Sequence, residues 1–92
     1  MLNNSSLAFE YHVQKYVHEE MCPEASEFID VHFADVARAF GGFGERVTSA
    51  EQFLPALRRA EESGKPAIID VAVSRELPPP VTRYESAGLR KI

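Results

Sequence analysis

Two adjacent asparagines, Asn3 and Asn4, stand near the amino end of the sequence, before Ser5-Ser6 and an amphipathic segment. Their position predicts that they lie where a short strand ends. Side-chain amide oxygens there can bind a hard cation, which takes its ligands from oxygen. Because no charged residue precedes the pair, we expect half of a cation site, completed by groups from elsewhere. The alternative is a frayed terminus with two turn-forming amides.

The other residues capable of chemistry follow no site pattern. His12, His18 and His32 lack the i, i+4 spacing of two metal ligands on one helical face. The glycine-rich stretch 41–44 lacks the full phosphate-binding fingerprint and follows a predicted helix, which favours a turn. A single cysteine, Cys22, excludes an internal disulfide and is typical of a reducing compartment.

The elements that must position the asparagines follow from hydrophobic spacing. A helix is expected from about Leu7 to Val17, with Ser5 or Ser6 as its N-cap. A solvated connection should follow over residues 18–30. A second helix is predicted to end at Gly41, which suits a left-handed residue. Its apolar stripe consists of Phe33, Val36, Ala37 and Phe40.

A third helix is predicted over residues 50–63. Thr48 with Glu51, or Ser49 with Gln52, has the spacing of a capping box. Pro55 removes a backbone hydrogen bond, so the helix is expected to start late or to kink. The side chains expected in the core are Phe53, Leu54, Leu57 and Ala60.

Strands are predicted at 43–47 and 67–73, on either side of the third helix. The second is almost uninterruptedly apolar, as in a parallel strand covered on both faces. Together they predict a right-handed βαβ unit. The expected fold class is α/β, a fragment of a doubly wound parallel sheet with three helices and two to three short strands. We assign residues 1–74 to this domain and residues 75–92 to a Pro-rich tail, extended over 77–81.

Composition limits the functional classes. The chain has 92 residues, a hydrophobic fraction of 45% and a formal net charge of −4. This composition suits one small α/β unit and argues against nucleic acid as a partner. No apolar run approaches the roughly 20 residues of a membrane span, and no secretory signal is recognisable. We therefore expect a cytoplasmic protein that does not bind membranes.

Two stretches carry a resemblance to a known family. The first is Leu2-Asn3-Asn4-Ser5-Ser6, and the second runs from Phe33 through Gly41-Gly42-Phe43-Gly44 to Ile68-Ile69-Asp70-Val71. In that order they resemble the C-terminal part of the thiamine-diphosphate-binding domain of acetolactate synthases, glyoxylate carboligases and pyruvate or benzoylformate decarboxylases. The first resembles the end of that family's Gly-Asp-Gly…Asn-Asn cofactor motif. The likeness covers residues 1 to about 73.

The resemblance implies a set of site residues. Asn4 would place its amide oxygen on Mg²⁺, and the main-chain carbonyl of Ser6 would be a second ligand, so that the ion bridges the protein to the cofactor's diphosphate. Leu7 is expected beside the cofactor with them. Glu10 occupies the place of an acidic residue that assists proton transfer in the decarboxylase branch, where many carboligases have an apolar residue.

The implied activity is decarboxylation or carboligation of a 2-keto acid, with thiamine diphosphate supplying the chemistry. The family's Gly-Asp-Gly does not occur in this sequence. We therefore expect the isolated chain to be inactive, and to act as a homo-oligomer or with the rest of the enzyme. The alternative is a non-catalytic α/β interaction module that uses its apolar face and Pro-rich tail on a partner protein.

Overall fold

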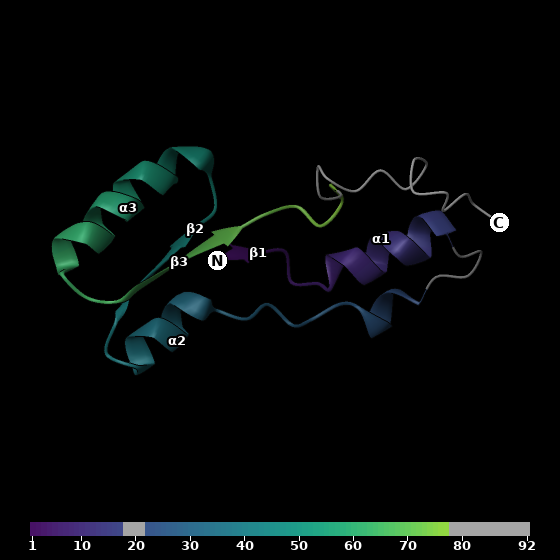
Figure 1. The fold of residues 1–92 in the computed structure, drawn as a ribbon, viewed down its shortest axis with the longest axis horizontal. Helices are drawn as coiled ribbons and strands as arrows, with labels where there is room; N and C mark the ends of the chain where they lie inside the picture. Colours follow the sequence, from purple (N-terminus) through teal and green to yellow (C-terminus); the bar gives the residue numbers. More distant parts are fainter. Residues whose placement is uncertain (18–21, 78–92) are drawn as a thin grey trace. The chain divides into compact units, whose positions relative to one another are not determined.

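The computed structural model describes residues 1–17 and 22–77. The described residues form three parallel strands, which pair in one sheet in the order β1-β3-β2, and three α-helices (Figure 1). This confirms the predicted α/β fold. The elements, in chain order, are β1 (Leu2–Asn3), α1 (Ala8–Val17), the 3₁₀ helix η1 (Pro23–Ala25), α2 (Phe33–Ala39), β2 (Phe43–Val47), α3 (Ala50–Ser63) and β3 (Ala67–Ala72).

The chain divides into two compact units. The sheet unit comprises Met1–Asn4 and Asp30–Val73, and therefore contains all three strands with α2 and α3. The second unit begins with Ser5–Ile29, which contains α1 and η1, and includes the described residues 74–77. The predicted Pro-rich stretch 78–80 and the rest of the tail lie outside the described residues, as do residues 18–21.

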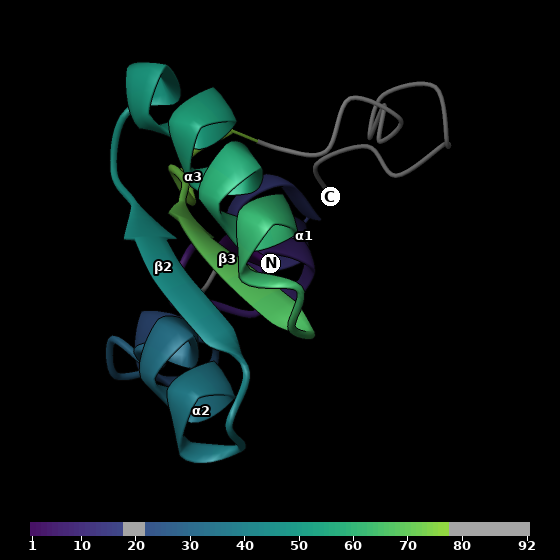
Figure 2. The ribbon, with the colours of Figure 1, turned by 90° about the vertical axis from the view of Figure 1, so that its left-hand side faces the viewer.

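The sheet unit has three layers. β3 is the central strand, and Figure 1 shows α3 and α2 on opposite sides of the strands. β2 and β3 run side by side over five register pairs, from Phe43–Ala67 to Val47–Val71 (Figure 2). β1 extends the sheet through Leu2–Val71 and Asn3–Ala72. The apolar character of the 67–73 segment thus reflects a central strand with a helix on each face, as predicted.

Small residues form the core of the sheet unit. The buried apolar side chains are Ala34, Ala37, Val47, Ala56 and Ala60. Gly44 of β2 explains why α2 comes so close, because a Cβ there would lie 1.9 Å from the carbonyl oxygen of Ala34. The alanine rows of both helices therefore face the sheet, at a distance that larger side chains could not tolerate.

The predicted core positions on the helices are largely wrong for this reason. Phe40 is 88% exposed and Leu54 is 60% exposed, although both were expected in apolar stripes. Phe53, Leu57 and Val36 are also exposed. Of the predicted α3 core only Ala60 is buried, and Ala56, one turn before it, completes the contact row.

The ends of the helices follow local chemistry. Gly41 is left-handed with φ of 80°, and the Gly42 N–H donates to the Ala37 carbonyl as in a Schellman motif. Helix α3 begins at Ala50 and continues through Pro55, so the expected late start is wrong. Ser49 is its N-cap residue, yet its side chain makes no capping hydrogen bond. The Gln52 Oε1 accepts instead from the Thr48 N–H.

The second unit contains a compact turn in a segment expected to be solvated. Ser6 and Glu27 form an antiparallel bridge, held by hydrogen bonds from the Leu7 N–H to the Ser26 carbonyl and from the Phe28 N–H to the Ser5 carbonyl. Ser26 is buried, but the other residues from 24 to 30 are exposed. The prediction therefore holds for most of the described part of this segment.

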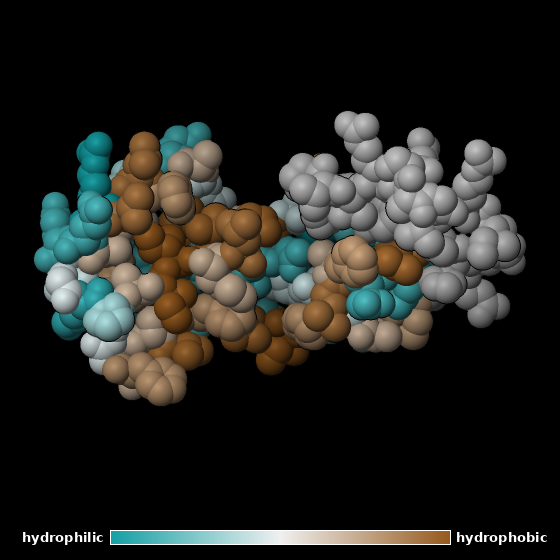
Figure 3. Space-filling view, viewed as in Figure 1, coloured by the Kyte–Doolittle hydropathy of each residue, from teal (hydrophilic) through white to brown (hydrophobic). Residues whose placement is uncertain are grey.

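The surface of the sheet unit carries many large apolar side chains. Figure 3 shows hydrophobic residues gathered on the face of this unit turned to the viewer. Within residues 1–17 and 22–77, no helix has both the length and the apolar character needed to cross a membrane.

Candidate functional site

The asparagine pair lies at the carboxyl end of the parallel sheet. Asn3 is the last residue of β1, and Asn4 follows it directly. Because β1 and β3 are parallel, Asn3 pairs with Ala72, the last residue of the central strand. In open parallel sheets, ligands bind outside the carboxyl ends of the strands. The first prediction about this pair, that it lies where a strand ends, is therefore correct.

Asn3 and Asn4 have different surroundings. The Asn3 side chain is buried, and its Nδ2 donates a hydrogen bond of 3.0 Å to the main-chain carbonyl of Val31. The Asn3 carbonyl accepts from the Val73 N–H at 2.9 Å. Asn4 is half-buried. Asn3 thus has a structural contact within the sheet unit, and Asn4 is the member of the pair with exposed surface.

A buried carboxylate lies at the same end of β3. Asp70 is fully buried, and its Oδ2 accepts from the Phe33 N–H at 3.1 Å. Phe33 is the first residue of α2, whose N-cap residue His32 makes no side-chain capping bond. Asp70 therefore provides the acceptor that the first turn of this helix needs, and its negative charge faces the positive end of the helix dipole.

Arg46 connects β2 to the same segment. Its Nη2 donates to Asp30 Oδ1 at 2.9 Å, and Arg46 is the register partner of Asp70. The hydrogen bond to Asp30 raises the pKa of the guanidinium, with a smaller contribution from the charge of Asp70. Arg46 Nη1 and Asp70 Oδ1 are buried without hydrogen-bond partners among the described residues.

The remaining predicted site residues belong to the second unit. Ser6 Oγ donates to the Ser26 carbonyl at 2.9 Å. Leu7 is half-exposed, and Glu10 is exposed on the first turn of α1. Ser5, which joins the two units, has a positive φ of 52°. A non-glycine residue in this region carries backbone strain of a kind often found at functional sites.

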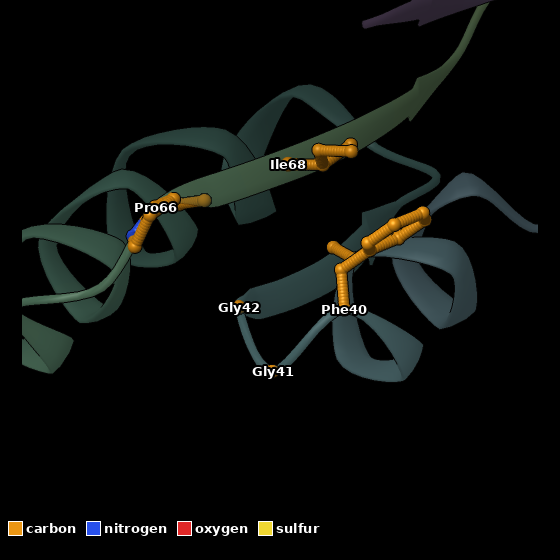
Figure 4. A pocket seen from close by; sticks show the side chains of 7 residues that line it. Phe40, Gly41, Gly42, Pro66 and Ile68 are labelled. Atoms are coloured by element: carbon orange, nitrogen blue, oxygen red, sulfur yellow. The ribbon is translucent and has the colours of Figure 1, made fainter.

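The cavity of the sheet unit lies at the other end of the strands. It has a volume of about 340 Å³ between the end of α2 and the start of β3. In Figure 4, the Phe40 and Ile68 side chains face each other across it. Its lining residues are Ala37, Phe40, Gly41, Gly42, Pro66, Ala67 and Ile68. All side chains that line this cavity are apolar, so none of them could bind a diphosphate or a metal ion.

Among the described residues, His12, His32 and Cys22 do not form a second site. His12 is buried in the second unit, with its ring 5.3 Å from that of Tyr11 in an edge-on arrangement. His32 is exposed and lies 3.7 Å from the Asp30 carboxylate. Cys22 is exposed. Within the described parts of the chain, no three His, Cys, Asp or Glu residues are grouped to hold a metal ion. His18 lies outside them.

The contacts of Asp70 and Arg46 were not foreseen from the sequence. A signal existed for Asp70, because it is the only charged residue in the apolar strand 67–73. Carboxylates are almost never fully buried unless they are paired. The partners, a helix N–H and an arginine, are distant along the chain and could not be identified from spacing.

Comparison with known proteins identifies a family that this sequence matches. Residues 1–71 match the model of a family described as thiamine pyrophosphate enzyme, C-terminal TPP binding domain. The sequence is 34% identical over 64 aligned residues to a Bacillus subtilis protein named "Putative thiamine pyrophosphate-containing protein YdaP", and the alignment covers 67% of this chain. The matched part is 11% of that relative's length. No solved structure matches significantly.

Proposed function

Because the chain belongs to the thiamine pyrophosphate enzyme family and carries its C-terminal TPP-binding domain, we propose that it binds the metal ion of a thiamine diphosphate site. In this proposal the Asn4 amide oxygen and the Ser6 main-chain carbonyl bind Mg²⁺, and Leu7 lies beside the cofactor. The parent activity is that of a 2-keto-acid decarboxylase or carboligase in the cytoplasm.

The observation that carries the proposal is the position of the asparagine pair. Asn3 and Asn4 stand at the carboxyl end of a strand in a parallel sheet, where ligands of such folds bind. Asn4 offers a neutral amide oxygen there, and hard divalent cations take amide and carbonyl oxygens as ligands.

The residues present fit one side of such a metal site. Both proposed ligands are neutral, and no group of three acidic, histidine or cysteine ligands occurs among the described residues. A divalent ion held between a protein and a diphosphate is usually bound through carboxylates as well. We therefore propose that the remaining ligands come from other parts of the enzyme, and that this chain alone neither binds the cofactor at micromolar concentration nor catalyses.

Thiamine diphosphate, when bound, would supply the electron sink for decarboxylation of a 2-keto acid. This chain's part in the reaction is to hold the metal end and to offer a carboxyl group. Glu10 is exposed on the first turn of α1, and we propose that it exchanges a proton with the substrate in the assembled enzyme.

A chimaera tests the metal-site proposal. Residues 1–71 of this chain, the part that matches the family model, replace their counterpart in the Bacillus subtilis relative, and thiamine diphosphate binding is measured by calorimetry with and without Mg²⁺. We expect binding that requires Mg²⁺. Replacing Asn4 with Ala removes the amide ligand and should weaken it by about 10-fold or more.

Gln52→Ala provides the control, because it deletes a side-chain amide at the start of α3. This variant should bind as tightly as the unsubstituted chimaera. Equal affinity for the Asn4→Ala and Gln52→Ala proteins would exclude Asn4 as a ligand. Micromolar binding of Mg²⁺ and thiamine diphosphate by the 92-residue chain alone would contradict the proposal of an incomplete site.

A further inference from the structure

The carboxyl ends of all three strands contact one short segment, residues 30–33. β1 reaches it through Asn3 Nδ2 and the Val31 carbonyl, at 3.0 Å. β3 reaches it through Asp70 Oδ2 and the Phe33 N–H, at 3.1 Å. We call these two contacts, together with the ion pair between Arg46 of β2 and Asp30, the strand-end clasp.

Two of the three contacts in the strand-end clasp are made by buried side chains. Asp70 is fully buried, and Asn3 retains 7% of its exposure. A hydrogen bond to a charged, buried carboxylate is stronger than one between neutral groups. Arg46 keeps a partly exposed side chain, so its ion pair with Asp30 is the weakest of the three contacts.

Asn3 is held on two sides. Its side chain donates to Val31, and its main-chain carbonyl accepts from the Val73 N–H at 2.9 Å. That carbonyl belongs to the planar peptide group that joins Asn3 to Asn4. The two bonds together therefore set the orientation in which the chain leaves β1 and enters Asn4.

We infer that Asn3 is a positioning residue, which acts through the strand-end clasp to hold Asn4 in the orientation that its metal-binding role requires. The inference rests on the proposed function of Asn4. It divides the asparagine pair into a buried structural member, Asn3, and a half-buried binding member, Asn4. Residues behind a metal ligand often matter almost as much as the ligand, because they hold it in place.

The first test uses the full chain without metal or cofactor. Nuclear magnetic resonance relaxation reports the order of the Asn4 side-chain amide, and hydrogen exchange reports the pairing of β2 with β3. Asn3→Asp keeps the side-chain shape but removes the Nδ2 donor. We expect it to lower the order of Asn4 while leaving the β2–β3 amides protected. The uncharged variant Asn3→Ala should do the same, which separates loss of the donor from the added charge.

Gln52→Glu is the matched control, since it makes the same amide-to-carboxylate change at a side chain that accepts rather than donates. It should leave Asn4 ordered. Unchanged order of Asn4 in Asn3→Asp and Asn3→Ala would overturn the inference. Loss of β2–β3 protection in both variants would also overturn it, because Asn3 would then hold the sheet rather than Asn4.

The second test measures thiamine diphosphate and Mg²⁺ binding in the chimaera. Asn3→Asp and Asn3→Ala should each weaken binding by about 10-fold or more, and Gln52→Glu should not. If Asn4→Ala weakens binding but the Asn3 variants do not, the positioning role fails and the proposed function stands. If Asn4→Ala does not weaken binding, the proposed function fails. The positioning role of Asn3 then fails too, even if the Asn3 variants lower the order of Asn4, because Asn4 would not be a metal ligand.

Discussion

Single atoms decide how closely helix α2 can approach the sheet. Gly44 has no Cβ, and the carbonyl of Ala34 occupies the space where one would be. At the other end of the same contact, the buried Asp70 carboxylate accepts from the first N–H of α2. Neither residue is of the apolar type expected in a buried strand, since Gly44 has no side chain and Asp70 has a carboxyl group. In each case the exception exists because a helix backbone lies directly against it.

Replacing Gly44 with Ala should destabilise the chain by about 3 kcal/mol, because the added methyl group would meet backbone that cannot move without separating α2 from β2. Urea denaturation followed by circular dichroism measures the free energy of unfolding. Gly41→Ala is the comparison: a Cβ there has open space but a positive φ, which should cost about 1 kcal/mol. A loss at Gly44 no larger than that at Gly41 would contradict the close approach.

Elements of the sheet unit are also joined by charge. The Arg59 Nε of α3 donates to Glu45 Oε2 of β2 at 2.9 Å, and a second guanidinium N–H bonds to the other carboxylate oxygen. The hydrogen bonds from Arg59 are the main reason that the pKa of Glu45 lies below its ordinary value of 4.5, against a smaller opposing effect of burial. The ion pair therefore ties α3 to the edge strand β2 when the carboxyl is ionised.

This ion pair predicts a pH dependence with a definite sign. Because the pKa of Glu45 is lower in the folded state than in the unfolded chain, its stabilising contribution is complete above about pH 5 and is lost as the pH falls through the lowered pKa. Glu45→Gln should therefore lose less stability than the unsubstituted chain between neutral and acidic pH. Thermal unfolding across this range measures the difference. Glu61→Gln, which changes an exposed carboxylate on α3, is the control and should show the same pH dependence as the unsubstituted chain. If the unfolding temperature changes with pH in the same way in all three proteins, the role of Glu45 is disproved.

At the scale of the whole molecule, the sheet unit has more apolar surface than its small core can cover. Its buried apolar residues are one valine and four alanines, while Phe40 and Leu54 are largely exposed. β1 and β2 are both outer strands of the sheet, each with one side open for further pairing within the described structure. Exposed apolar patches and open strand edges favour association. We propose that the chain associates with itself or with the rest of its enzyme.

The isolated chain should therefore dimerise, or be poorly stable as a monomer. Size-exclusion chromatography with light scattering measures its mass over a range of concentrations. Phe40→Gln and Leu54→Gln remove exposed apolar surface and should shift the chain toward the monomer, whereas Arg58→Gln should not. A well-folded monomer at high concentration would refute this prediction.

The sequence alone determined the order of elements, the parallel βαβ unit and the family. Those features depend on local signals: Gly41 after a helical stripe, the apolar run 67–73, and the asparagine pair before a helix. Such signals can be recognised in the sequence because caps, turns and hydrophobic periods involve residues close together along the chain.

Only the tertiary structure decided which face of each helix meets the sheet and what holds the asparagine pair. Ala56, rather than Phe53 or Leu57, packs inward beside the predicted Ala60, because the distance between layers is set by contacts such as Gly44 against Ala34. The three contacts of the strand-end clasp join residues that are 28, 37 and 16 positions apart in the chain. A hydrophobic period identifies the apolar side of a helix. Which row of side chains on that side packs against the sheet depends on the distance between helix and sheet, and this distance is set by the residues of both elements.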